Sequence, residues 1–511
     1  MKKTLALVLT LTLLGKITAA EAKTTNYPNT KLPMSTNMPV GSIYYDYLEK
    51  LDGLGFINSM LYGNKPYARV DMARWTMEAR AKSKTKSTSP FIANMISELE
   101  QALAPEIASI ENNTKAGQLK LHSISVEAVH SNSAEDNYGY KGLAGSAWQP
   151  FSTNNNGHHY GDGLNMDVYA YLSGNLSNEV AVSLSPRLGY DGDKHFKAAL
   201  DEGYVASRIG IYKIEVGKQA MEWGQGASGK LALSNNARPF TMAKISSEEM
   251  PAYRGILSVL GKTRWTGFLA KGAGNRTDYG VPDYDDPYMV GVRSDFIYPN
   301  LTVGVARVGM LGGKRNSFNL SNAWNWATGK NDEEKWDNIT GVDFRYRFPG
   351  MQVYGEFYGE SQKYFLPKQT GYRGGLYFPR LTEDGTWDLT IEGARTGNTW
   401  YTHDTYQTGW NYHNDIMGDA MGPDAHKYYA GIKHYFNAKD TVGLHGLYQK
   451  LASWSGVEPG VKETWLSYRH KLNGSDSWSA MIGLARLEDL NYTANRNNTD
   501  KFIKLTWERS Y

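Results

Sequence analysis

Residues 340–360 read TGVDFRYRFPGMQVYGEFYGE. Apolar and charged side chains alternate from 342 to 348, and Pro349-Gly350 then provides a turn. The alternation resumes from 351 to 358. Because successive strand residues point to opposite faces, each half of this stretch has one apolar and one polar face. The stretch therefore predicts a β-hairpin whose apolar face suits lipid and whose charged face suits the interior of a barrel.

The same pattern recurs along the chain, with short turns at 175–178, 437–440 and 473–476. Nine longer polar segments separate the hairpins: 131–164, 189–201, 218–250, 271–287, 310–338, 360–372, 396–425, 451–461 and 488–499. If all nine lie at one end of a barrel, they connect about eighteen antiparallel strands. We therefore predict an all-β transmembrane barrel, closed because an open sheet edge in lipid leaves backbone groups unpaired. A soluble propeller or sandwich is the alternative.

The last strand and the composition agree with this class. Ile503, Leu505, Trp507 and Tyr511 fall on one face of an alternating strand, a pattern that resembles the C-terminal strand of bacterial outer-membrane barrels. Arg509 interrupts this face, which is tolerable near a membrane interface. Aromatic residues make up 13% of the chain, as in barrels with aromatic girdles at both interfaces.

The N-terminus indicates export. Lys2 and Lys3 precede the apolar run 4–14, and Ala20-Glu21-Ala22 is suited to signal-peptide cleavage. The run is too short for a transmembrane helix, which needs about 20 residues. Removing residues 1–22 lowers the formal charge from +3 to +1, which argues against nucleic acid as a partner. The chain contains no cysteine, so disulfides, a thiol nucleophile and cysteine-based metal sites are excluded.

Between the signal peptide and the barrel, the pattern is helical. Ser42 is suited to capping a helix through about Leu51, and Asp71 to capping a second one. Ser89-Pro90 begins a third, with an apolar stripe from Ile92 to Leu103. We predict a small periplasmic bundle over residues 23–115, followed by the barrel over 116–511. The bundle is expected to act as a plug, or else as a docking platform for periplasmic envelope machinery.

The segment Trp223–Phe240, WGQGASGKLALSNNARPF, is the most distinctive polar stretch. Its Gly224–Lys230 part matches the beginning of a phosphate-binding loop, but Leu231 stands where that loop needs Ser or Thr. No helix follows either, so a nucleotide site is not expected. By the strand count, the segment follows the fifth strand and lies outside the barrel or folds into its lumen.

This segment resembles the W-G-P-G…L-x-L-S-N-N-A-R-P element of the Wzi family of capsule-assembly outer-membrane proteins. Gln225 stands here in place of the usual proline. The stretch 44–57 and Lys65-Pro66-Tyr67-Ala68-Arg69 are also similar to that family. The resemblance implies an eighteen-stranded barrel with a periplasmic helical bundle. It also implies a lectin-like protein in the outer membrane of a Gram-negative bacterium, which attaches capsular or exopolysaccharide to the surface and assists capsule assembly.

Two sets of candidate site residues follow. Aromatic rings in long loops suit sugar binding, and the glycan-binding candidates are Trp148, Tyr160, Trp324, Trp326, Trp400, Trp410 and Tyr412. The residues of the family motif are Trp223, Gly224, Gly226, Ser234, Asn235, Asn236, Arg238 and Pro239. Loop packing is the alternative for the aromatic set. For Asn235, Asn236 and Arg238, a structural tie to the barrel wall is favoured over contact with sugar.

Other activities are less well supported. No catalytic motif is found, so we do not expect an enzyme, and no cofactor is predicted. Acidic clusters near Asp283–Asp286 and Asp332–Glu334 match no calcium-loop spacing, so no metal site is predicted. The second functional hypothesis is a porin or an oligosaccharide-specific channel. Expected partners are polysaccharide and outer-membrane lipid with lipopolysaccharide, and the chain is expected to be monomeric with its long loops extracellular.

Overall fold

The computed structural model describes most of the chain after residue 32. The described residues are 33–112, 114, 117–132, 148–192, 194–250, 255–274, 277–278, 281–282, 286–314, 316, 319–328, 335–363, 366–451 and 456–511. The predicted signal peptide, residues 1–22, lies outside them, as does the 23–32 part of the predicted bundle.

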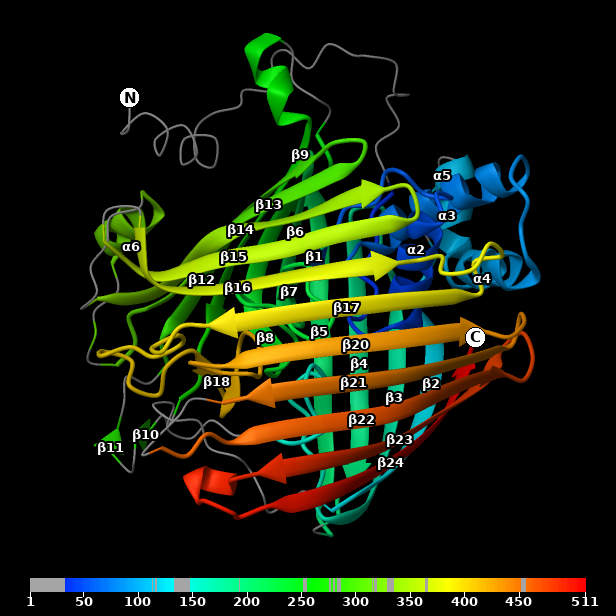
Figure 1. The fold of residues 1–511 in the computed structure, drawn as a ribbon. Helices are drawn as coiled ribbons and strands as arrows, with labels where there is room; N and C mark the ends of the chain where they lie inside the picture. The colour runs from blue at the N-terminus through cyan, green and yellow to red at the C-terminus, as the bar shows by residue number, and fades with distance from the viewer. Residues whose placement is uncertain are drawn as a thin grey trace.

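Eighteen antiparallel strands form one closed barrel (Figure 1), which confirms the predicted fold class and strand number. The barrel strands are β2 (Lys120–Ser131), β3 (Gly163–Asn175), β4 (Val180–Tyr190), β5 (Phe196–Ile209), β6 (Tyr212–Gln219), β8 (Phe240–Ser247), β9 (Lys262–Lys271), β12 (Tyr288–Ile297), β13 (Leu301–Leu311), β14 (Trp336–Phe348), β15 (Met351–Lys363), β16 (Leu366–Phe378), β17 (Trp387–Thr396), β20 (His426–Tyr435), β21 (Asp440–Lys450), β22 (Gly460–Lys471), β23 (Asp476–Glu488) and β24 (Asn498–Ser510). Three two-stranded sheets lie outside the wall: β1 (Asn64–Lys65) with β7 (Glu222–Trp223), β10 (Thr277–Asp278) with β11 (Val281–Pro282), and β18 (Asn411–Tyr412) with β19 (Asp415–Ile416).

The first and last strands close the barrel. β2 pairs with β24 in a register that places Val126 opposite Trp507. On the outer face of β24, Ile503 and Leu505 are exposed, as predicted, and Tyr511, which follows the strand, is also exposed. Arg509 forms a bidentate pair with Asp476 at 2.8 Å. Closure satisfies the backbone groups that an open edge would leave unpaired in a bilayer.

The hairpin β14–β15 has the predicted faces. Asp343 lies opposite Glu356 and both are buried in the lumen, whereas Val342 lies opposite Phe357 and both face outward. An apolar outer band and a polar interior are the pattern of a barrel that spans a bilayer. Among the described residues, no helix has the length and hydropathy needed to cross a membrane.

The two barrel ends have different connections. The short-turn end includes the Pro349-Gly350 turn, and the long-loop end includes the connections 132–162 and 397–425. The expected loop positions are wrong in two ways. In the first, strands run into the expected loops: β4 continues to Tyr190 and β5 begins at Phe196, within the long segment expected at 189–201. Strand pairing in β15–β16 continues to Lys363↔Leu366, within the long segment expected at 360–372. A strand that extends past the lipid band does not need an apolar outer face, so its pattern resembled a loop.

Strand β8 is the second correction, because it lies inside the polar segment expected at 218–250. Its large apolar side chains, Phe240 and Met242, are buried in the lumen, while Thr241 and Ala243 face outward. This reversal of the usual barrel pattern concealed the strand. The connection 248–261 that follows contains a 3-10 helix, η1 (Gly255–Leu260).

Among the described residues, four helices precede the barrel: α2 (Ile43–Gly53), α3 (Arg69–Ser83), α4 (Pro90–Ala102) and α5 (Ala104–Asn112). Ser42 caps α2 and accepts a hydrogen bond from Tyr44 N, as expected. The expected cap at Asp71 is wrong, because α3 begins at Arg69 and places Asp71 in its first turn. Three helices were expected, but α5 starts directly after α4, with Pro105 in its first turn where proline is tolerated.

The bundle fills the barrel mouth at the short-turn end (Figure 1). Lys50 Nζ donates to the carbonyl oxygen of Pro379 at 2.7 Å and pairs with Asp388 at 3.3 Å. Arg347 Nε on β14 pairs with Asp52 Oδ2 at 2.8 Å. These groups are largely buried, so the pairs are weakly screened by salt and fix the bundle to the wall. Two further short helices lie at the long-loop end, α6 (Leu320–Ala327) and η2 (Leu490–Tyr492).

Candidate functional site

The motif segment Trp223–Phe240 follows β6, the fifth barrel strand, and folds into the lumen. At its start, the Trp223 ring packs against Phe268 of β9 with ring centroids 5.4 Å apart. Farther along, the Ala227 amide reaches Glu392 of β17. Strands β9 and β17 lie six strands apart around the barrel, so the segment crosses the lumen from one part of the wall to another.

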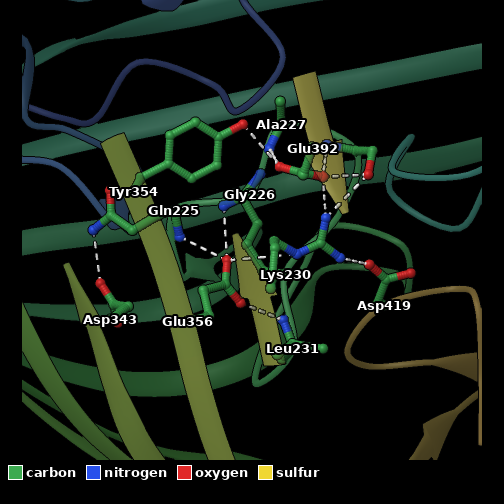
Figure 2. A network of polar contacts seen from close by, with 12 residues as sticks. Gln225, Gly226, Ala227, Lys230, Leu231, Asp343, Tyr354, Glu356, Glu392 and Asp419 are labelled. Carbon is green, nitrogen blue, oxygen red and sulfur yellow. Dashed lines mark hydrogen bonds and ion pairs between the residues drawn. The ribbon is translucent and has the colours of Figure 1, made fainter. Parts of the chain in front are cut away.

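Glu356 of β15 holds the first turn of the segment (Figure 2). Its Oε1 accepts hydrogen bonds from the amides of Gln225 and Gly226, both at 2.7 Å, and its Oε2 accepts one from Leu231 N at 2.8 Å. Gln225 Nε2 also donates to Asp343 Oδ1 at 2.7 Å. One carboxyl group thus accepts three backbone hydrogen bonds from the motif segment.

A second carboxylate, Glu392, holds the next turn. It accepts hydrogen bonds from Ala227 N at 2.7 Å and Ser228 N at 3.1 Å. Arg373 of β16 donates from one fork to Glu392 and to Asp419 of the 397–425 loop. All three of these charged side chains are buried. The motif segment and the 397–425 loop are therefore anchored to the wall by the same arginine.

Lys427 completes this cluster. Its Nζ lies 2.5 and 2.7 Å from the two carboxylate oxygens of Asp419 and donates to Ser228 O at 2.9 Å. Burial disfavours ionisation of Asp419, but Lys427 and Arg373 outweigh it and hold the pKa of that carboxyl below its usual range. The carboxylate therefore stays charged and bound between the two cations.

Two glycines make this geometry accessible. Gly224 has φ +138°, a conformation that side-chain-bearing residues rarely adopt. At Gly226, an added Cβ would overlap the Gly229 carbonyl oxygen. Both glycines therefore have a structural reason within the turn, and nucleotide binding is not needed to explain them.

The remaining motif residues join the segment to neighbouring loops. Ser234 Oγ donates to Gly418 O at 2.5 Å, Asn235 Nδ2 to Asn154 O at 2.9 Å, and Asn236 Nδ2 to Ile416 O at 2.9 Å. All three side chains are buried, as is Pro239. The motif asparagines therefore bond to neighbouring loops, not to the barrel wall to which the sequence favoured a tie, and contact with a sugar stays a separate prediction. Arg238 differs because it is exposed.

Six of the seven predicted glycan-binding rings are buried. Trp148, Trp400, Trp410 and Tyr412 share one apolar cluster with the motif residues Trp223 and Leu231, Tyr160 belongs to a second cluster, and Trp326 to a third. Their hydrogen bonds point inward: Trp410 Nε1 donates to Ala232 O at 3.2 Å and Tyr160 OH to Glu127 Oε1 at 3.0 Å. These rings pack the loops together and present no face to solvent.

Trp324 is the exception, with 54% of its surface exposed. It lies on α6, which Asn319 caps by accepting a hydrogen bond from Asn322 N at 2.8 Å. Trp326 lies two positions further along the same helix and is 2% exposed. The Cζ atom of Arg307 lies over its ring, 5.2 Å from the ring centroid. The helix thus anchors one tryptophan in the protein and presents the other to solvent.

The site residues predicted from the sequence do not include Glu356, Arg373, Glu392, Asp419 or Lys427. The signal was partly present, since Glu356 falls on the charged face of the quoted hairpin. Alternation showed that such groups face the lumen. Contacts between residues more than 100 positions apart decide which lumen-facing side chains reach the motif segment. The alternation of residues along one strand contains no information about such contacts.

The acidic clusters remain largely outside the described residues. Asp283, Asp285 and Asp332–Glu334 all fall in undescribed segments, and Asp286 pairs with Lys271 at 3.2 Å. In the part of the chain that the structure describes, no group of three or more His, Asp or Glu side chains is suited to a metal ion.

Comparison with known proteins identifies the family. The model of the family described as capsule assembly protein Wzi matches residues 135–502. Among curated sequences, no protein matches the chain. The solved structure of Wzi from Escherichia coli aligns with a TM-score of 0.68 at 16% identity, over 93% of this chain and 100% of that one. That protein is described as an outer-membrane, carbohydrate-binding β-barrel involved in group 1 capsule assembly.

Two other solved structures align less well. OccK5 of Pseudomonas aeruginosa gives a TM-score of 0.46 at 10% identity, over 77% of this chain and 98% of its own. OccAB3 of Acinetobacter baumannii gives 0.44 at 8% identity, over 76% and 99%. The family match covers well over half of the chain, and the β-barrel fold agrees with it. The chain therefore belongs to the Wzi family of capsule-assembly proteins.

Proposed function

We propose that this chain is an outer-membrane protein that binds capsular or exopolysaccharide at its long-loop end. In this role it attaches the polymer to the cell surface and assists capsule assembly. The carrying observation is that the motif segment crosses the lumen and is fixed there by Glu356, Glu392 and Arg373. A barrel whose interior is occupied in this way suits a binding platform better than an open pore.

The proposed orientation follows from the two barrel ends. Bacterial outer-membrane barrels have short periplasmic turns and longer extracellular loops. The long-loop end is therefore assigned to the cell exterior, and the short-turn end with its bundle to the periplasm. The signal peptide proposed at residues 1–22 would provide the export that this orientation requires.

Two exposed residues at the long-loop end are the first candidates for contact with polymer. Trp324 offers a ring face on α6, and aromatic faces are common in carbohydrate recognition. Arg238 offers an exposed guanidinium, whose planar fork suits carboxylates such as those of uronic acids. The buried aromatic residues around them hold the loops in place, which reduces the ordering cost of binding.

Other parts of the molecule support the same assignment. The apolar outer band suits outer-membrane lipid and lipopolysaccharide. Buried pairs such as Lys50–Asp388 favour the bundle as a plug of the barrel mouth over a docking platform for envelope machinery. The wall closes on itself through β2 and β24, so a monomer satisfies all strand edges. The proposed role is binding without catalysis.

The test is a deletion strain scored for capsule. Cells lacking the chain should shed polysaccharide into the medium, and wild-type protein should restore cell-bound capsule. A Trp324→Ala variant that reaches the membrane at normal levels should restore it less well. Unchanged cell-bound capsule in the deletion strain would count against the proposal.

The second hypothesis, a diffusion channel, has a separate test. Purified protein in planar bilayers should show no steady conductance of porin size, because the motif segment and the bundle occupy the lumen. A steady open pore would favour the channel. Incubating the protein with capsule and looking for chain shortening tests for hydrolysis.

A further inference from the structure

A cavity of about 920 Å³ lies between the helical bundle and one sector of the barrel wall, and hydroxyl, charged and aromatic side chains line it. Exposed Ser475 and Tyr511 line it at the short-turn end, so it reaches solvent there. At the opposite end it meets Asn155 and His158 of the long-loop segment. No residue of the motif segment lines it, which separates it from the candidate site at the long-loop end.

The barrel side of this cavity is a surface of small hydroxyl side chains. They come from four adjacent strands, β22, β23, β24 and β2, and alternate with outward apolar residues such as Leu466, Ile482 and Leu505. The inward residues are Ser123, Ser125, Ser467, Ser477, Ser479 and Thr506. Each hydroxyl both donates and accepts hydrogen bonds, and its small size leaves the cavity open.

Many of the charged groups around the cavity are paired, although Lys120 and Glu508 line it without an ion pair of their own among the described contacts. Glu98 of α4 lies 3.6 Å from Arg469 and 3.3 Å from Lys471, and Lys433 pairs with Asp46 at 2.7 Å. A strongly anionic ligand such as a phosphate ester requires cations that are not already neutralised. The partly exposed rings of Tyr44 and Tyr169 also line the space. Hydroxyls, paired charges and aromatic rings together suit an uncharged, hydroxyl-rich ligand.

We propose that this cavity is a second saccharide site, which takes a short, uncharged or weakly charged oligosaccharide from the short-turn end. Its volume lies near the top of the roughly 300–1,000 Å³ typical of small-molecule sites. The ligand class rests in part on the proposed glycan-binding function, whereas the hydroxyl surface is an independent observation. In the proposed orientation, this site would face the periplasm.

The absence of cysteine from the sequence makes a direct test available. The variants Ser479→Cys and Ser125→Cys each place one thiol in the cavity, and a small charged thiol reagent reports whether it is accessible. Maltohexaose serves as the neutral probe, and an oligogalacturonate of equal length as the acidic one. At about ten times its Kd, a bound probe should slow modification of both thiols about tenfold, since roughly nine-tenths of the sites are then occupied.

The matched control is Ser177→Cys, in an exposed turn at the same end but outside the cavity. It should react at the same rate with and without either probe. In intact cells, a reagent that does not enter the periplasm should leave the Ser479→Cys variant unmodified, and permeabilised cells should allow modification. Heat-modifiability in gels identifies variants with a folded barrel, and Ser125→Cys replaces any variant that does not fold.

Protection by maltohexaose exceeding that by oligogalacturonate supports the proposal. Equal modification rates with and without both probes overturn it, as does a thiol that stays unreactive in permeabilised cells. Protection by the acidic probe alone overturns the assigned ligand class. Failure here is distinguishable from failure of the surface role, because Trp324→Ala and capsule retention test only the long-loop end.

Discussion

The backbone amide of Gly226 donates a hydrogen bond of 2.7 Å to the carboxylate of Glu356, across the lumen and 130 positions along the chain. This contact joins the motif segment to the barrel wall through a buried carboxyl group. The same carboxylate accepts two further amides, from Gln225 and Leu231. Glu356 therefore acts as the anchor on which the motif segment folds (Figure 2).

Replacing Glu356 with glutamine should loosen this segment. A glutamine keeps one acceptor oxygen but directs an NH₂ group at an amide donor, so at least one backbone N–H loses its partner. We expect a loss of about 1–3 kcal/mol in the free energy of unfolding, the usual cost of leaving a buried backbone donor without its partner. Urea unfolding of the purified barrel measures it.

The control for this variant is Glu488→Gln, because Glu488 forms an exposed pair with Lys462. Exposed pairs contribute about 0–1 kcal/mol, so its unfolding midpoint should barely change. Equal effects of the two substitutions would contradict the anchoring role of Glu356.

Arg373→Lys should release the 397–425 loop together with the motif segment. Arg373 reaches Glu392 and Asp419 with the two arms of one planar fork, whereas a lysine has a single ammonium point. We expect faster proteolysis in both segments, measured by limited digestion with mass spectrometry. Arg486→Lys, in an exposed pair with Glu488, is the control and should digest like wild type. Faster cleavage in only one segment would show that Arg373 does not link them.

Gly226→Ala should destabilise the fold by about 1–3 kcal/mol, the usual cost of overpacking. The new methyl group would overlap the Gly229 carbonyl oxygen. Gly374→Ala is the matched control, since an added Cβ on that β16 glycine meets nothing within 4 Å. Thermal unfolding of both variants provides the measurement, and a neutral Gly226→Ala would mean that the turn is less tightly packed than described.

Trp324→Ala should reduce polysaccharide binding while leaving stability within about 0.5 kcal/mol, because the ring is mostly exposed. Trp326→Ala should instead destabilise by about 3–5 kcal/mol, since that ring is buried against Leu311 and Trp336. Retention on immobilised polysaccharide and thermal unfolding separate the two effects. Unchanged retention by Trp324→Ala would remove this residue from the proposed contact surface.

Docking of α3 should weaken in acid. Burial raises the pKa of Asp71, but Arg264 of β9 and Arg74 outweigh it and hold that pKa below its ordinary value of 3.8. A depressed folded-state pKa gives stability that is present above the unfolded pKa and lost as pH falls through the folded one. We therefore expect amide hydrogen exchange in α3 to increase as pH falls below about 4, after correction for the intrinsic exchange rate.

In an Asp71→Asn variant, this pH-dependent part of the exchange should disappear, because the amide does not titrate. Contact with Arg264 at 2.8 Å would then be weaker at every pH. If the variant keeps the same acid response as wild type, other carboxylates in the bundle control its docking.

The sequence by itself determined the barrel and its strand number. The alternation of apolar and polar residues along a strand is a local property of the sequence. The hairpin at 340–360 shows this alternation because one face of each strand must meet lipid. The same logic failed at β8, where Phe240 and Met242 face inward to pack the motif segment. It also failed between β15 and β16, where the strands run beyond the apolar band.

Only the tertiary structure decided what the motif and the aromatic residues do. Trp400 and Trp410 resembled exposed sugar-binding rings because loop composition does not reveal burial, yet both are 0% exposed against the folded-in segment. Trp324 and Trp326 differ by two positions in one helix and have opposite exposure, which a helical turn of 3.6 residues and one packed face explain. The periodicity of the sequence thus predicted the strands of the barrel wall. The arrangement of the loops inside the barrel depends on contacts between residues that are distant in the sequence.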